Sequence, residues 1–122
     1  MSDLARVRVH GNQGMLALVI AGEIDISNVS DVREAIDSKI AEATVLTIDL
    51  CATTFLDSSA IAMLLAVADR LRTTRRKMYI VIPDDAPIRR LAKLSGLDAQ
   101  VPVLSSADEV SKSDPEGNQT AP

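Results

Sequence analysis

A short run of polar side chains, Asp57-Ser58-Ser59, carries the most distinctive chemistry of this chain. A serine hydroxyl can accept a phosphate from a kinase, which adds about 1.5 to 2 negative charges and three acceptor oxygens. The same side chains can simply cap a helix, because short oxygen-bearing groups accept hydrogen bonds from the free N–H groups of a first helical turn. Local chemistry alone favours the cap, since such triplets are common at helix starts.

The surroundings of the triplet predict a strand, a turn and a helix. Residues 45–50 are nearly all apolar, which is typical of a strand that is buried on both faces. Apolar residues recur at steps of three and four from Ile61 to Leu71, which predicts a helix. Ser58 would then stand at the helix start, where the helix dipole and free N–H groups favour an added phosphate.

A second motif, Gly22-Glu23-Ile24-Asp25, follows an apolar strand expected over residues 15–21. Asp25 has two interpretations, and the residues alone do not decide between them. It can close a turn by accepting hydrogen bonds from backbone N–H groups. It can also line the surface beside Ser58, because the carboxyl ends of parallel strands meet at one edge of a sheet.

The two motifs, residues 22–25 and Phe-Leu-Asp-Ser-Ser-Ala-Ile-Ala at 55–62, resemble the STAS domain family and, within it, the bacterial anti-sigma-factor antagonists. The resemblance covers residues 5–104. In that family the first serine after the motif aspartate is phosphorylated, which implies Ser58 as the phosphorylation site. The resemblance further implies a set of partner-binding residues: Asp25, Asp57, Ser59 and Ala60. The family usually has glycine at the position of Ala60, and this departure bears on how closely a partner's backbone can approach.

The resemblance implies a partner-switching cycle. The dephosphorylated protein would bind an anti-sigma factor that is also a serine kinase of the GHKL type, and the sigma factor would be released. The kinase would then phosphorylate Ser58 and the complex would separate, until a PP2C-type phosphatase resets the cycle. The alternative is a STAS interaction module of a signalling scaffold or lipid transporter, in which Ser58 is only a helix cap.

The order of the remaining elements predicts an α/β fold. A single STAS-like domain is expected over residues 4–104, with a mixed, mostly parallel sheet of about five strands and about three helices. The expected strands cover residues 4–10, 15–21, 45–50, 78–83 and 101–104. From residue 105 the sequence is polar and aperiodic. At most one helical turn is expected over 107–110, within a disordered polar tail that runs to residue 122.

The sequence argues against an enzyme. The single histidine, His10, is far in sequence from the serine pair, so no base is identifiable to activate Ser58. No glycine pattern for nucleotide binding is present, and we expect no catalytic residue, cofactor or metal. Cys51 has no second cysteine or nearby histidine, and a small buried thiol is the favoured interpretation.

Composition narrows the class of protein further. The net charge of −4 argues against direct nucleic-acid binding. The basic cluster Arg70, Arg72, Arg75, Arg76 and Lys77 is best explained as a solvated helix end. No apolar run approaches the roughly 20 residues of a membrane span, and the first residues do not open a signal peptide. With a single cysteine, a cytoplasmic location is the simplest expectation.

Overall fold

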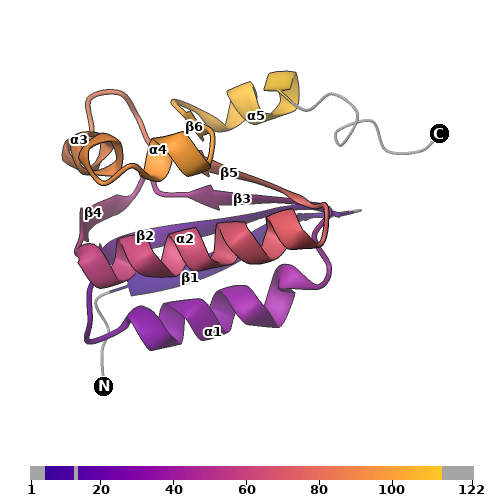
Figure 1. The fold of residues 1–122 in the computed structure, drawn as a ribbon, viewed down its shortest axis with the longest axis horizontal. Coiled ribbons are helices and arrows are strands. Elements are labelled where there is room, and N and C mark those ends of the chain that lie inside the picture. The colour runs from indigo at the N-terminus through magenta and orange to yellow at the C-terminus, as the bar shows by residue number, and fades with distance from the viewer. Residues whose placement is uncertain (1–4, 13, 114–122) are drawn as a thin grey trace.

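The computed structural model describes residues 5–12 and 14–113 (Figure 1). Its strands are β1 (Ala5–Asn12), β2 (Met15–Ile24), β3 (Val45–Asp49), β4 (Thr53–Leu56), β5 (Lys77–Val81) and β6 (Val103–Leu104). Its helices are α1 (Val29–Ile40), α2 (Ser58–Thr73), α3 (Pro87–Leu94), α4 (Leu97–Gln100) and α5 (Ala107–Ser113). The predicted α/β class is confirmed.

The strands form a mixed sheet in the order β1-β2-β3-β5-β6, and β4 pairs with the far end of β2. β1 and β2 make an antiparallel hairpin, whereas β2–β3, β2–β4, β3–β5 and β5–β6 are all parallel. The predicted mixed, mostly parallel sheet is therefore confirmed. The parallel strands β2 and β4 end side by side at Ile24 and Leu56, so the sheet delivers both motifs to one edge.

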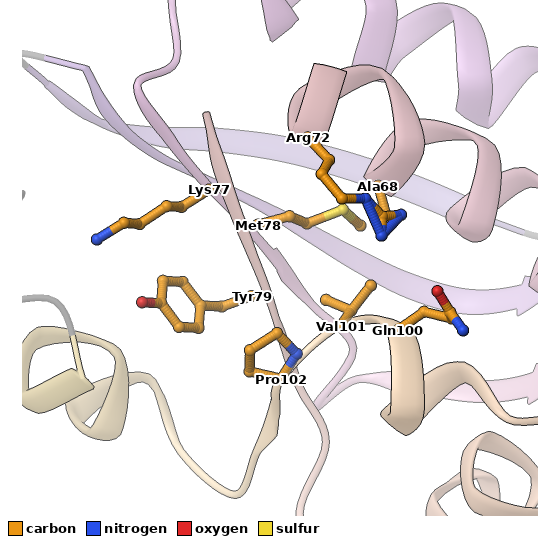
Figure 2. A pocket seen from close by; sticks show the side chains of 8 residues that line it. All are labelled: Ala68, Arg72, Lys77, Met78, Tyr79, Gln100, Val101 and Pro102. Carbon is orange, nitrogen blue, oxygen red and sulfur yellow. The ribbon is translucent and has the colours of Figure 1, made fainter. Parts of the chain in front are cut away.

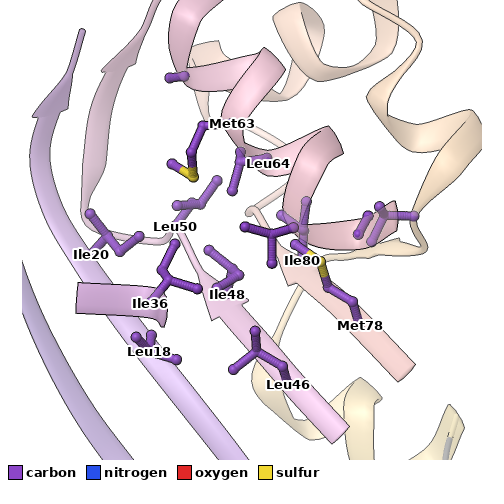
Figure 3. Close-up of a cluster of buried hydrophobic side chains, with 14 of the residues drawn as sticks. Leu18, Ile20, Ile36, Leu46, Ile48, Leu50, Met63, Leu64, Met78 and Ile80 are labelled. Carbon is purple, nitrogen blue, oxygen red and sulfur yellow. The ribbon is translucent and has the colours of Figure 1, made fainter. Parts of the chain in front are cut away.

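The main core is aliphatic and fills the space between one face of the sheet and the helices α1 and α2 (Figures 1 and 3). Alternate residues of β2, β3 and β5 point into it, because side chains of a strand alternate between the two faces. The fully buried members include Leu18, Ile20, Ile36, Leu46, Ile48, Leu50, Leu64 and Ile80. Burying each such side chain contributes about 1.5–3 kcal/mol, so this layer holds α2 firmly against the sheet.

A sixth strand, β4, was not predicted. It is short, and its two middle residues Thr54 and Phe55 are exposed, so the sequence has no apolar run there. The buried Thr53 hydroxyl donates a hydrogen bond of 2.6 Å to the Ile20 carbonyl, which ties β4 to β2. Gly22 does not end β2 as expected. It takes a positive φ of 102° where the register shifts, and the strand continues to Ile24.

The C-terminal helix α5 is longer than the single turn that the sequence predicted. Its Val110 is 5% exposed and packs with Val45, Tyr79 and Val81 in a small second cluster. These strand residues alternate with those of the main core, so α5 covers part of the opposite face of the sheet. One apolar residue in this helix sufficed to dock it, which is too weak a pattern to recognise. Residues 114–122 of the predicted tail lie outside the described residues.

Candidate functional site

The predicted helix start is confirmed, and Asp57 is its N-cap. The Asp57 Oδ1 atom accepts hydrogen bonds from the backbone N–H groups of Ser59 and Ala60 at 2.9 and 3.1 Å. It also accepts one from the Ser59 hydroxyl. Asp57 therefore satisfies N–H groups that a helix start would otherwise leave without a partner.

The second oxygen of the same carboxylate joins the two sequence motifs. Asp57 Oδ2 accepts a hydrogen bond of 2.9 Å from the N–H of Ile26, and the Asp57 N–H donates to the Ile24 carbonyl at 3.2 Å. The hydrogen bond from the Ser59 hydroxyl is the largest of the effects that hold the pKa of Asp57 below its ordinary value of 3.8. Partial desolvation raises this pKa, whereas the hydrogen bonds from the backbone N–H groups of Ala60, Ile26 and Ser59 lower it further. Asp57 is therefore a carboxylate at neutral pH.

Asp25 closes a turn, as one of its two interpretations predicted. Its Oδ1 accepts hydrogen bonds from the N–H and the hydroxyl of Ser27. Asn28, which is 2% exposed, supports the same turn from beneath. The Asn28 amide oxygen accepts from the Asp25 N–H at 2.9 Å, and its Nδ2 donates to the Glu23 carbonyl at 2.8 Å. Asn28 is also the N-cap residue of α1, but its side chain makes no capping hydrogen bond and holds the loop together.

The two serines differ in their surroundings. Ser58 is the first residue of α2 and is exposed, and within the described part of the chain its hydroxyl has no hydrogen-bond partner. The Ser59 hydroxyl is engaged by Asp57. A kinase can therefore reach the Ser58 oxygen without breaking an existing contact. The N–H groups of Ser59 and Ala60, however, already serve Asp57, so a phosphate on Ser58 would rely on the helix dipole more than on free N–H groups.

Two large apolar side chains are exposed on the segments that enter the site. Ile26 is 76% exposed and follows Asp25 in the loop after β2, and Phe55 is 46% exposed on β4. β4 pairs with the end of β2 and leads directly into Asp57. Exposed large apolar groups beside a functional loop are typical of a protein-binding surface. Their exposure could not be predicted, because nothing in the sequence pattern separates these two residues from core residues.

Ala60 and Ser59 have different positions relative to the surface. The Ala60 side chain is fully buried in the main core, so its methyl group is not available to a partner. Ser59 lines a groove of about 290 Å³ between the first halves of α1 and α2, together with Val29, Ser30, Arg33, Ala62 and Met63. Contact of Ser59 and Ala60 with a partner protein remains a prediction.

The basic cluster lies at the other end of α2 and has structural partners there. Arg70 forms an ion pair of 2.8 Å with Asp37 of α1. Arg76 donates to the carbonyls of Ile40 and Ala43, and so fastens the end of α1. Arg72 borders a hollow of about 280 Å³ that is also lined by Ala68, Lys77, Met78, Tyr79, Gln100, Val101 and Pro102 (Figure 2). This end of α2 is opposite the end that bears Ser58.

The other residues considered for chemistry lie elsewhere. His10 is exposed on β1. The expectation of a buried Cys51 was wrong, because this residue is exposed in the turn after β3. Partial burial of the sulfur, the Asp49 hydrogen bond and the Asp49 charge raise the pKa of the Cys51 thiol to about 11, so it is protonated at neutral pH. Within residues 5–12 and 14–113, no His, Cys, Asp or Glu group could hold a metal ion. None of the described helices is long and apolar enough to cross a membrane.

The sequence matches the STAS domain family over residues 6–110, and the chain belongs to that family. It is 31% identical to the anti-sigma-F factor antagonist RsfB of Mycobacterium tuberculosis, over 85% of this chain and 84% of the relative. The crystal structure of an anti-sigma factor antagonist from Mycobacterium paratuberculosis superposes with a TM-score of 0.81 at 27% identity, covering 89% and 92% of the two chains.

The fold is also that of SpoIIAA, at 17% sequence identity. The unphosphorylated SpoIIAA structure matches with a TM-score of 0.73, covering 90% of this chain and 97% of SpoIIAA. The phosphorylated form of the Bacillus protein matches with a TM-score of 0.66, covering 88% and 99%. The α/β architecture of this chain is thus shared with anti-sigma factor antagonists.

Proposed function

We propose that this protein is an anti-sigma-factor antagonist of the cytoplasm that is switched by phosphorylation of Ser58. In its dephosphorylated form it binds an anti-sigma factor, which then releases its sigma factor. The relatives named above support the antagonist role. One observation carries the choice of Ser58: its hydroxyl is exposed and unengaged at the helix start, whereas Ser59 beside it is held by Asp57.

The surface around Ser58 has the features that a protein partner requires. Ile26 and Phe55 offer exposed apolar area, and Asp25, Asp57 and Ser59 form its polar part. Hydrogen bonds within the loop fix this surface before a partner arrives, which limits the entropy lost on binding. The kinase of the cycle is the anti-sigma factor itself, of the GHKL type, and a PP2C-type phosphatase restores the hydroxyl.

Phosphorylation acts through local charge. The phosphate adds about 1.5 to 2 negative charges next to the carboxylate of Asp57, with Asp25 on the neighbouring loop. The helix dipole tolerates this charge in the free protein. In a desolvated interface like charges cost several kcal/mol, and each 1.4 kcal/mol is tenfold in affinity. We therefore expect binding to weaken by about 100-fold or more, with little change of fold.

The decisive experiment uses the anti-sigma factor kinase and ATP. One phosphate should be added, and fragmentation should place it on Ser58. Ser58→Ala should bind the partner and remain bound in ATP, whereas Ser58→Glu should bind poorly and keep the circular dichroism spectrum of the wild type. Ser59→Ala is the matched control and should still be phosphorylated. If Ser58→Glu binds as tightly as the wild type, a fixed STAS interaction module is the better account.

A further inference from the structure

Helix α3 carries an apolar stripe that extends past the core. Ile88 and Ala92 are buried beneath the helix and Leu91 is partly buried, so these residues hold α3 on the domain. Leu94 follows Leu91 by one turn in the same stripe, but it is 72% exposed. An apolar stripe that continues into solvent beside a basic surface is typical of a site where another protein binds.

Two cations next to Leu94 lack a partner in the part of the chain that the structure describes. Arg90 and Lys93 are exposed and form no ion pair or hydrogen bond there. Arg89, in contrast, pairs with the Asp84 carboxylate at 3.3 Å. Interfaces between proteins bring opposite charges together, so Arg90 and Lys93 favour a partner with acidic side chains.

The outer surface of α3 borders a hollow of about 800 Å³. Its lining consists of Asp84, Ala86, Pro87, Arg89, Arg90, Lys93, Leu94 and Asp98. A polyanion such as a nucleic acid would meet the two carboxylates as well as the cations. A protein segment can place acidic side chains at the cations and an apolar side chain at Leu94, so a protein fits this surface better.

The outer surface of α3 adjoins the surface around Ser58. α3 packs against β4, which carries the exposed Phe55 and leads directly into Asp57 and Ser58. Figure 1 shows α3 and β4 at the same end of the sheet as the start of α2. A partner that covers Ser58 with a standard interface of about 800 Å² spans about 30 Å, which is enough to reach α3.

We propose that Arg90, Lys93 and Leu94 form a second contact region for the anti-sigma factor. This inference rests on the proposed function and adds to it. The region binds a segment of the partner in which acidic side chains flank an apolar one. It lies on a different element from Ser58 and shares no printed contact with it among the described residues, so the two regions should contribute to affinity independently.

Titration of the unphosphorylated protein against the purified anti-sigma factor tests this inference. Arg90→Glu places a carboxylate against the acidic segment and should weaken binding about tenfold, with a smaller loss at about 1 M salt. Leu94→Ser removes apolar contact area and should weaken binding severalfold. Lys112→Glu reverses another exposed charge, on α5, and is the matched control that should bind like the wild type.

Steady-state phosphorylation distinguishes a contact region from a structural fault. Arg90→Glu should raise the KM of the kinase for this protein about tenfold and leave kcat unchanged, because the contact on α3 is the same before and during phosphate transfer. Its circular dichroism and melting temperature should equal those of the wild type. When Arg90→Glu is combined with Ser58→Glu, the two fold-losses of affinity should multiply.

The outcomes separate this inference from the proposed function. If Arg90→Glu and Leu94→Ser bind the anti-sigma factor as tightly as the wild type, the contact on α3 is wrong and the proposed function stands. If Lys112→Glu loses as much affinity as Arg90→Glu, net charge is the cause and the contact on α3 is again wrong. A wild type that neither binds the anti-sigma factor nor is phosphorylated by it would overturn the proposed function, and this inference with it.

Discussion

The carboxylate of Asp57 holds the N–H of Ile26 at 2.9 Å, across 31 positions of sequence. The same side chain caps α2 through the N–H groups of Ser59 and Ala60. The start of α2, which carries Ser58, and the loop after β2 are therefore fixed by one residue. Because Ile26 is exposed on that loop, the shape of the proposed partner surface depends on a helix cap.

Replacing Asp57 should separate its two roles. Asp57→Asn keeps one oxygen that can cap the helix but loses the charge and the second acceptor. Asp57→Ala loses the capping oxygen as well. We expect the melting temperature to fall by several degrees for Asp57→Ala and by less for Asp57→Asn. Hydrogen exchange at the Ile26 amide should be faster in both variants. An unchanged exchange rate at this amide would show that the carboxylate does not hold the loop.

The cap should also be sensitive to acid. Folding lowers the pKa of Asp57 below its ordinary value of 3.8, so the folded state binds this proton less readily than the unfolded state. Its stabilising contribution is complete above that ordinary value and is lost as the pH falls through the lowered pKa. Urea unfolding of the wild type and Asp57→Asn should therefore differ at pH 7 and converge as the pH falls below 3.8. A gap that stays constant down to acid pH would contradict this origin of the effect.

The features that the sequence predicted well have strong local causes. The cap at Asp57 follows from short-range hydrogen bonding, and α2 follows from the spacing between Ile61 and Leu71. The two-motif arrangement follows from the rule that parallel strands share an edge. All three depend on residues close in sequence or on a general property of sheets.

The features that were missed depend on contacts between distant residues. β4 pairs with β2 and is tied to it by the Thr53 hydroxyl, which donates to the Ile20 carbonyl. α5 packs on the sheet through Val110. Exposure of Ile26 is equally hidden, because it alternates with the fully buried Ile24 in the same motif. A sequence pattern records residue type and spacing, but it does not record which apolar residue the chain leaves uncovered.

The buried amide of Asn28 should be required for the loop that carries Asp25. Asn28→Ala leaves the Asp25 N–H and the Glu23 carbonyl without their partner, which should lower the free energy of unfolding by about 1–3 kcal/mol. Asn28→Asp restores the acceptor but not the donor, and an intermediate loss is expected. Chemical denaturation measures both. Equal stability of all three proteins would show that water replaces the amide at no cost.

The C-terminal helix should contribute to stability through Val110. Val110→Asp places a charge against Val45, Tyr79 and Val81, and the free energy of unfolding should fall by about 2–3 kcal/mol. Deleting residues 112–122 leaves Val110 in place and serves as the control, with no expected change in melting temperature or partner binding. A loss of several degrees in the truncated protein would mean that the terminal segment also packs on the domain.

The replacement of the usual family glycine by Ala60 should affect folding rather than phosphorylation. The Ala60 methyl group is fully buried, so Ala60→Gly should lower the free energy of unfolding by about 1–2 kcal/mol, from lost burial and reduced helix propensity. Ala62→Gly, at an exposed position of the same helix, carries the propensity cost alone and should lose at most about 1 kcal/mol. The initial rate of phosphate transfer to Ser58 should be the same in both variants as in the wild type, because neither methyl group lies between the kinase and the hydroxyl. A severalfold faster transfer to Ala60→Gly, with Ala62→Gly unchanged, would instead show that the alanine restricts the approach of the kinase.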